Sequence, residues 1–107
     1  MTDMKDRVTA FEAKYANDAE ILFKIEARAC KLFGVWIAEN VLNLDDDEAN
    51  TYGQTLVSEN LKNPGFEDVM DFVRQDLKDH GITYDNAELY RQFGLALEDA
   101  EEQIKQP

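Results

Sequence analysis

Proline occurs in this sequence only at Pro64 and Pro107, and apolar residues recur at intervals of three and four almost throughout. Proline in a helix interior removes a backbone hydrogen bond and clashes with the preceding turn, so long stretches without it can stay helical. No segment has the alternation of apolar and polar residues that is typical of a half-buried strand. These patterns predict an all-α fold.

Capping and turn residues divide the helical pattern into segments. They are Asn17-Asp18, Asn43, Asp45 or Asp46, Asn63-Pro64-Gly65, His80-Gly81 and Asp85-Asn86-Ala87-Glu88. Short polar side chains accept hydrogen bonds from the first turn of a helix, and glycine suits the left-handed position after its last turn. The sequence therefore predicts helices at about residues 19–43, 46–62, 66–80 and 85–105, which form a four-helix bundle with short loops.

Helical spacing also predicts which residues form the core of this bundle. The expected core face of residues 19–43 consists of Leu22, Ile25, Ala29, Leu32 and Trp36, widened by Phe33, Ile37 and Val41. In residues 46–62 it consists of Ala49, Tyr52, Leu56 and Leu61, and in residues 66–80 of Phe66, Val69, Met70, Val73 and Leu77. In residues 85–105 it consists of Leu89, Phe93, Ala96 or Leu97, and Ala100. Gly53 is expected to weaken its helix, because glycine costs about 1 kcal/mol relative to alanine in a helix interior.

A shorter apolar stripe precedes the bundle and consists of Met4, Val8, Phe11 and Tyr15. Periodicity alone is equally consistent with an ordinary first helix that packs on the bundle. A helix of this length is marginal in water, however, and such a segment can fold on binding a partner. Our hypothesis is a mobile or frayed N-terminal helical arm over residues 1–17, flexible when free, followed by the bundle over residues 18–107.

The charge of the chain is distributed unevenly. The first 33 residues carry six basic and six acidic side chains, so the formal net charge of −12 comes entirely from Gly34 onward. This acidity argues against nucleic acid or an anionic membrane as a partner, because both require a basic surface. The sequence has no apolar run long enough for a membrane span, no resemblance to a signal peptide, and a single cysteine. We expect a cytoplasmic protein that is monomeric when free.

The candidate chemical groups favour structural roles over catalysis or metal binding. The run Asp45-Asp46-Asp47-Glu48 lacks the glycine of a calcium loop and suits a helix N-terminus. His80, the only histidine, lacks the Glu-x-x-His context of a di-iron bundle and is expected at a helix end. Cys30 lies beside an apolar stripe, which favours a buried structural thiol. The residues therefore give no positive case for an enzyme.

Three segments in the first third of the chain are similar to a known family. They are Phe11-Glu-Ala-Lys-Tyr-Ala-x-Asp, Phe23-Lys-x-Glu-Ala-Arg and Lys31-Leu-x-Gly-x-Trp. They resemble the ATPase inhibitor zeta subunit of bacterial F1Fo ATP synthase, a family formerly catalogued as a domain of unknown function. A weaker similarity continues in Glu67-Asp-Val-Met, Asp76-Leu-x-x-x-Gly-Ile and Ala87-Glu-Leu, so the resemblance covers essentially the full length.

The resemblance implies a regulatory protein and not an enzyme. Its N-terminal helix would enter an interface between the alpha and beta subunits of F1, next to the gamma subunit, and block rotation in the hydrolytic direction. Phe11 and Tyr15 would be apolar anchors, and Arg7 and Lys14 would pair with carboxylates of the enzyme. The full set of partner-binding residues is Met4, Arg7, Val8, Phe11, Glu12, Lys14 and Tyr15. Such a protein would be peripheral to the inner membrane through F1.

Other interpretations remain open at this stage. Val8 stands where the family often has an acidic residue, and Ala29-Cys30 replaces a more polar pair. Some family members are reported to bind adenine nucleotides, but no residue pattern here indicates a cofactor site. The chain could also be a nucleotide-sensing ligand-binding module or an acidic protein-interaction adaptor. Because the arm has no histidine, we predict little pH dependence of inhibition between about pH 6.5 and 8.

Overall fold

The computed structural model describes the backbone of residues 4–62 and 66–105, and the side chains from Val8 onward within those ranges. The described residues form five α-helices and no strand, which confirms the predicted all-α class. The helices are α1 (Met4–Lys14), α2 (Ala19–Asn40), α3 (Asp46–Lys62), α4 (Phe66–Asp79) and α5 (Asn86–Lys105). The predicted turn at Asn63-Pro64-Gly65 lies outside the described residues.

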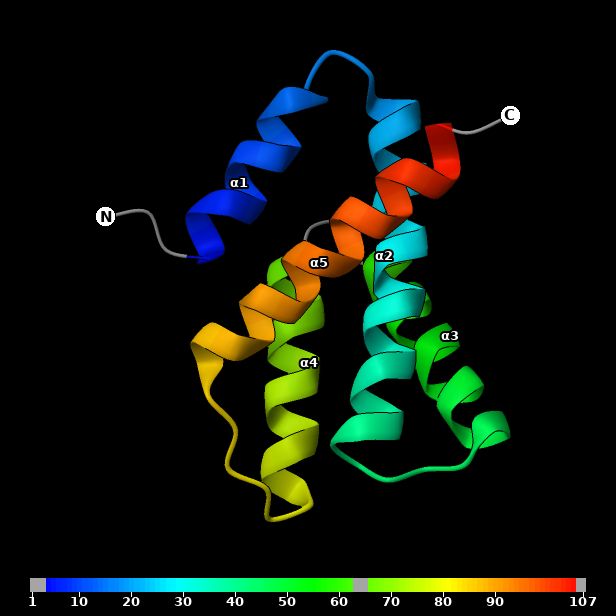
Figure 1. Cartoon of the computed structure of the whole chain (residues 1–107), viewed down its shortest axis with the longest axis vertical. Coiled ribbons are helices and arrows are strands. Elements are labelled where there is room, and N and C mark those ends of the chain that lie inside the picture. Colours follow the sequence, from blue (N-terminus) through cyan, green and yellow to red (C-terminus); the bar gives the residue numbers. More distant parts are fainter. Residues whose placement is uncertain (1–3, 63–65, 106–107) are drawn as a thin grey trace.

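The helices α2 and α3 pack side by side, and α3 also contacts α4. The last helix, α5, does not run parallel to them. It crosses obliquely in front of α2 and α4, and α1 folds back to pack against it (Figure 1). We refer to the part of the chain from α2 to α5 as the body.

Three aspartates begin helices as predicted. Asp18 caps α2, where its side chain accepts a hydrogen bond from the Ile21 N–H at 3.2 Å. Asp45 Oδ1 accepts from the Glu48 N–H at 2.8 Å, and Asp85 Oδ1 accepts from the Ala87 N–H at 3.0 Å. Each carboxylate satisfies a backbone donor that has no partner within its own helix. Asp45, within the acidic run, is therefore a helix cap.

The predicted helix ends are correct for α4 but wrong for α2. After α4, Gly81 has a φ of +71°, and the Ile82 N–H bonds back to the Leu77 carbonyl at 2.9 Å, as in a Schellman cap. The helix α2 ends at Asn40 and not at Asn43. Asn43 instead has a left-handed φ of 57°, and the Leu44 N–H reaches the Ala38 carbonyl at 2.9 Å. This closing turn uses the three residues that we had assigned to the helix.

The core lies where α2, α4 and α5 meet and is rich in aromatic rings. The Phe33 ring packs edge-on against Phe93 at 5.4 Å between centroids, and Phe66 stacks on Phe93 at 6.1 Å. The predicted core faces of α4 and α5 are confirmed. The buried residues there are Phe66, Val69, Met70, Val73 and Leu77 on α4, and Leu89, Phe93, Ala96, Leu97 and Ala100 on α5, with Tyr90 in addition.

The predicted core faces of α2 and α3 need correction. The buried face of α2 is centred on Ile25, Ala29, Phe33 and Ile37, and also includes Cys30, Gly34 and Ala38. Leu22, Leu32, Trp36, Val41 and Tyr52 are only half-buried, and Leu61 is 54% exposed. The stripe on α2 is rotated from the expected one because this helix packs against both α3 and α5. Cys30, Gly34 and Ala38, which we had not assigned to the core, are therefore buried, whereas Leu32 and Trp36 are only half-buried.

Gly53, which we expected to weaken α3, is what allows α2 and α3 to approach closely. A Cβ atom on Gly34 would lie 2.7 Å from the Gly53 Cα. A Cβ atom on Gly53 would lie 2.9 Å from the Lys31 carbonyl oxygen and 2.7 Å from the Lys31 Cδ. Real Cβ atoms do not come so close to backbone atoms, so both positions require glycine at this helix crossing.

Candidate functional site

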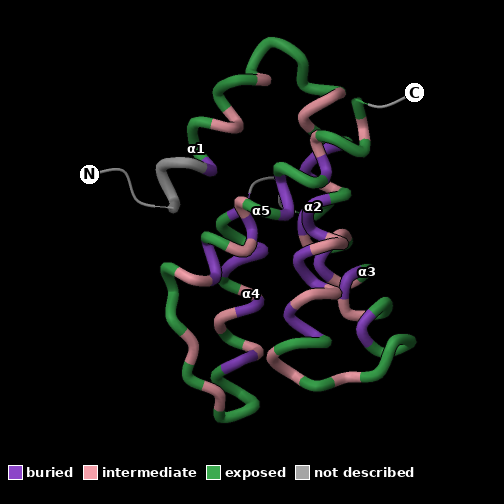
Figure 2. Tube along the Cα trace, viewed as in Figure 1, coloured by how far each residue is buried: buried purple, intermediate pink, exposed green. Residues whose placement is uncertain are grey.

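The apolar face of α1 lies against the body. Val8 is 1% exposed and belongs to the main hydrophobic core, whereas Phe11 and Tyr15 are half-buried beside it (Figure 2). The Phe11 and Tyr15 rings pack with their centroids 5.3 Å apart. Val8 and Phe11 share one face of α1, as their spacing predicts, Tyr15 continues that face in the turn directly after the helix, and α1 contacts α5. The structure thus places the arm in a docked position.

A short link of turns joins α1 to α2, and the remaining contacts between α1 and the body are made by side chains. Residues 15–18 form turns, in which the Asp18 N–H bonds to the Tyr15 carbonyl at 2.9 Å. Asp18 then starts α2 independently of α1. Of the residues that we predicted to bind a partner, Val8, Phe11 and Tyr15 pack on the body. One helix face cannot be buried in two places, so binding through Val8, Phe11 and Tyr15 requires α1 to leave α5.

A polar cluster holds the C-terminal end of α1 to α5. The Tyr15 hydroxyl donates a short hydrogen bond to Glu101, and the Lys14 Nζ lies 3.0 Å from the same carboxylate. Lys105 approaches Glu101 at 3.7 Å. Lys14 and Lys105 also lie 5.4 and 5.5 Å from the centre of the Tyr15 ring. The Tyr15 hydrogen bond and the two lysines lower the pKa of Glu101, so this carboxylate stays ionised while α1 is docked.

A second contact, between two acidic side chains, lies farther inside the arm–body interface. Glu26 of α2 is 8% exposed, and burial raises its pKa to about 7, assisted by the charge of Glu12 and a hydrogen bond with it. Burial also raises the pKa of Glu12, and Glu67 at the start of α4 adds to the increase. Two buried carboxylates cannot both ionise cheaply. The protonated Glu26 carboxyl therefore donates a hydrogen bond to the Glu12 carboxylate.

Cys30 lies one helical turn from Glu26 on the buried face of α2. Its side chain is 1% exposed, and burial, together with the charge of Glu26, raises the pKa of the thiol to about 12. A thiol of this kind remains protonated near neutral pH and is a poor nucleophile. The predicted buried thiol is confirmed.

The Glu101 cluster gives a test of docking that leaves α1 itself unchanged. Replacing Glu101 by glutamine removes the charge that faces Lys14 and Lys105, and weakens the bond from Tyr15. A charge-assisted contact of this kind contributes on the order of 1 kcal/mol, so we expect the amides of α1 to exchange with deuterium about fivefold faster. Glu102→Gln on the exposed side of α5 is the matched control. Unchanged exchange in Glu101→Gln would show that this cluster does not hold the arm.

The structure brings together five of the seven predicted partner-binding residues. Val8, Phe11, Glu12, Lys14 and Tyr15 all contact or interact with the body or with one another. The side chains of Met4 and Arg7 lie outside the described residues. Their backbone belongs to α1.

The two body carboxylates that receive the arm, Glu26 and Glu101, were not among the residues that we predicted from the sequence. A signal for Glu26 was present. Glu26, Cys30, Phe33 and Ile37 follow helical spacing, so this acidic residue lies on the buried face of α2. Glu101 carries no comparable signal, because it is one of several carboxylates near the end of an acidic helix.

The described residues contain no group of three or more histidine, cysteine, aspartate or glutamate side chains arranged to hold a metal ion. None of their helices combines the length and the apolarity needed to cross a membrane. His80 lies just after α4, where its Nδ1 is 2.8 Å from the Asp76 carbonyl oxygen, and it is exposed, as expected of a residue at a helix end.

Comparison with known proteins gives one match. The family model described as ATPase inhibitor subunit zeta matches residues 1–103. This range contains all five described helices except the last two residues of α5. No curated protein and no solved structure matches the chain significantly.

Proposed function

The chain belongs to the ATPase inhibitor subunit zeta family, and on this basis we propose that it inhibits ATP hydrolysis by F1Fo ATP synthase. In this proposal α1 inserts at an interface between the alpha and beta subunits of F1, next to the gamma subunit. It blocks rotation of gamma in the hydrolytic direction. The observation that supports this mechanism best is the apolar face of α1, which packs on the body and is joined to it by a short link.

The proposed roles follow from the chemistry of each side chain. Val8, Phe11 and Tyr15 exchange their contacts with the body for contacts with the enzyme, where buried aromatic anchors contribute most of the binding energy. Lys14 leaves Glu101 and pairs with a carboxylate of the enzyme. Met4 and Arg7 extend the apolar stripe and the basic flank of the arm. Glu12 leaves Glu26, which frees both carboxylates to ionise.

Docking on the body and insertion into the enzyme are therefore competing states of α1. The apparent affinity of the protein for the enzyme equals its intrinsic affinity reduced by the fraction of molecules in which the arm is free. The hydrogen bond between Tyr15 and Glu101 lies within this protein, and it weakens inhibition because it holds the arm on the body. In this scheme, the body limits how readily the arm becomes available.

The test of the proposal is steady-state ATP hydrolysis by purified cognate F1Fo with added full-length protein or with protein lacking residues 1–17. We expect inhibition by the full-length protein alone. Because Val8 is part of the core, circular dichroism must show that the truncated protein remains helical at the assay temperature. Inhibition by a folded truncated protein would place the activity in the body, and absence of inhibition by the full-length protein would contradict the proposal.

Point substitutions within the arm keep the chain length constant. We expect Phe11→Ala to weaken inhibition about tenfold or more, and Lys5→Ala to weaken it less, because a buried aromatic anchor contributes more than a charge at the rim. Phe11→Ala also removes a contact between the arm and the body, which increases the fraction of molecules with a free arm. This increase offsets part of the loss of affinity for the enzyme. The inhibition constant of each variant, measured by titration against the enzyme, gives the comparison. A larger loss for Lys5→Ala would contradict the assignment of Phe11 as an anchor.

A further inference from the structure

A groove on the body is lined by basic residues, although the chain as a whole is acidic. It lies along α2, is closed by α3 and the end of α5, and has a volume of about 700 Å³. Its lining contains three basic residues, Lys24, Arg28 and Lys31, and no acidic residue. The whole chain has 11 basic and 23 acidic residues. The charge of its lining is therefore opposite in sign to the net charge of −12 of the whole chain.

The floor and the rim of the groove are apolar. Phe23 is 50% exposed, which is unusual for so large an apolar side chain, and Val57 and Ile104 face it from α3 and α5. An exposed aromatic beside cationic side chains is the composition of a docking surface. The groove can thus accept apolar side chains along its length and carboxylates at its edge.

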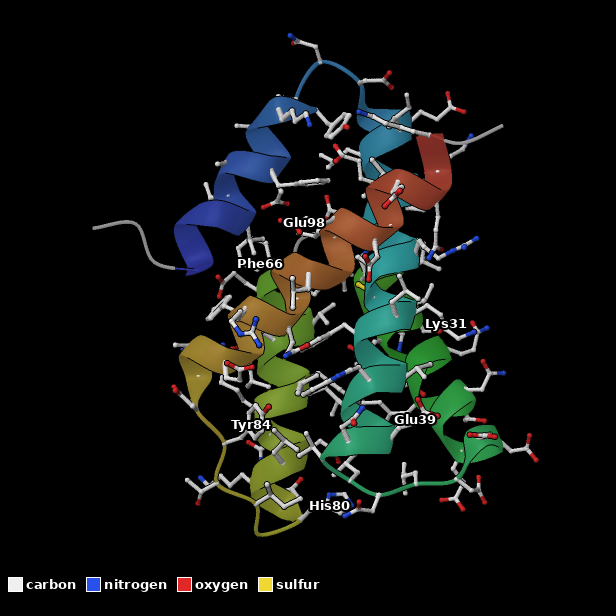
Figure 3. All side chains as sticks on the ribbon, in the orientation of Figure 1. Lys31, Glu39, Phe66, His80, Tyr84 and Glu98 are labelled. Carbon is white, nitrogen blue, oxygen red and sulfur yellow. The ribbon has the colours of Figure 1, made fainter. Side chains whose placement is uncertain are left out.

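Two of the three basic side chains, Arg28 and Lys31, have no ion-pair partner among the described residues, and the third has only an exposed one. The Arg28 Nη1 donates to the Gln103 Oε1 at 2.7 Å, which orients the guanidinium and leaves its charge available. The stem of Lys31 packs over Gly53, and its ammonium group has no ion-pair partner among the described residues (Figure 3). Lys24 forms one loose pair with Glu20 at 3.4 Å, and both side chains are largely exposed. The charges of Arg28 and Lys31 are thus available to a ligand, and Lys24 can exchange its exposed pair with Glu20 for a ligand carboxylate.

The position of the groove indicates where its ligand comes from. Phe23 and Lys24 lie in the first two turns of α2, directly after the link that joins the arm to the body. If α1 inserts into the enzyme as proposed above, this end of α2 is the part of the body nearest to the insertion point.

From these observations we infer that the groove is a second docking site for the same enzyme, and that it binds an acidic amphipathic helical segment on the F1 surface. This inference rests on the proposed function. Carboxylates of the segment pair with Lys24, Arg28 and Lys31, and its apolar residues pack on Phe23. The arm then stops rotation, and the groove keeps the body bound while the arm inserts and withdraws.

Charge reversal in the full-length protein separates the two sites. We expect Lys24→Glu combined with Lys31→Glu to weaken binding to F1Fo about tenfold or more, and to reduce the salt dependence of binding. Maximal inhibition at saturating protein should be unchanged, because the arm is intact. The control Lys78→Glu combined with Lys62→Glu makes the same charge change at exposed sites on α4 and α3 outside the groove. Equal affinity of the groove variant and the control would overturn the inference.

Photo-crosslinking identifies the ligand of the groove. A photoreactive phenylalanine analogue at position 23 of the full-length protein should cross-link to an acidic helical segment of an F1 subunit, and the same analogue at position 11 reports on the arm. A cross-link from position 11 alone, or from position 23 to a second copy of this chain, would overturn the inference and leave the proposed function standing. Absence of inhibition and of both cross-links would remove the two proposals together.

Discussion

Replacing Gly34 by valine is expected to lower the free energy of unfolding by about 3 kcal/mol. The first side-chain atom would lie 2.7 Å from the Gly53 Cα and 3.0 Å from the Leu56 Cδ1. Because the nearest atom belongs to the backbone, no rotamer change can relieve the contact, and α2 must move away from α3. Movement of α2 also disturbs the packing of Phe33 and Phe93. Denaturation in urea, followed by circular dichroism, measures the change.

Gly94 provides a matched control in the same protein. It lies within α5, where a Cβ atom would have no neighbour within 4 Å. Alanine at this position gains helix propensity without a clash, so Gly94→Ala should raise the free energy of unfolding by about 0.5–1 kcal/mol. The two substitutions should therefore have opposite signs. A Gly34→Val protein as stable as the parent would refute the requirement for glycine at the crossing of α2 and α3.

The affinity of the docked arm for the body is expected to fall about tenfold between pH 6 and 8. In the docked state, burial, the charge of Glu12 and the hydrogen bond with Glu12 raise the pKa of Glu26 from 4.5 to about 7, and we expect undocking of α1 to return it toward its ordinary value. Between pH 4.5 and about pH 7, the docked state therefore binds one more proton than the free state, and docking weakens as the pH rises. The affinity of the arm for the body falls little further above about pH 7, since Glu26 is then ionised in both the docked and the free state. This expectation replaces the weak pH dependence that we predicted from the absence of histidine in the arm.

The pH dependence of docking also predicts the direction in which inhibition changes with pH. A higher pH releases the arm, so inhibition of F1Fo should strengthen as the pH rises, for as long as the docked state predominates. Glu12, Glu67 and Cys30 are the other titratable groups that interact with the pair. Carbon-detected nuclear magnetic resonance of the Glu26 carboxyl gives its pKa directly. Hydrogen exchange of α1, corrected for the intrinsic rate, gives the docking equilibrium at each pH.

Glu26→Gln should remove most of this pH dependence. A glutamine amide donates to the Glu12 carboxylate at any pH, so α1 should stay docked at pH 8 and inhibition there should be weaker than in the parent protein. Glu39→Gln, at the exposed far end of α2, is the control and should behave like the parent (Figure 3). If docking in the parent protein were as strong at pH 8 as at pH 6, Glu26 would not be the linked group.

Local signals in the sequence were sufficient to locate the helices. Asp18, Asp45 and Asp85 cap their helices because the relevant hydrogen bonds join residues two or three apart. Gly81 ends α4 for an equally local reason, its left-handed φ. The end of α2 was missed because its closing hydrogen bond, from Leu44 to Ala38, depends on a loop of several residues with no single strong signal.

The sequence also predicted the amphipathic character of the arm, whereas it did not predict where the arm packs. The spacing of Val8, Phe11 and Tyr15 defines one face of a helix, whichever surface that face contacts. The side chains that receive it, Glu26 and Glu101, come from positions 14 and 89 residues beyond Glu12 in the chain. A periodic pattern contains no information about such distant contacts.

The sequence by itself determined the all-α class, most helix bounds, and the amphipathic arm, since each depends on interactions within a few residues. The tertiary structure alone decided that α2 packs on two sides, that Gly53 permits a close crossing, and that α1 lies docked on α5. It also brought Glu12 next to Glu26 and gave Glu26 its high pKa. Burial and charge pairing depend on which surfaces come together, and the free energy of the whole folded chain decides this.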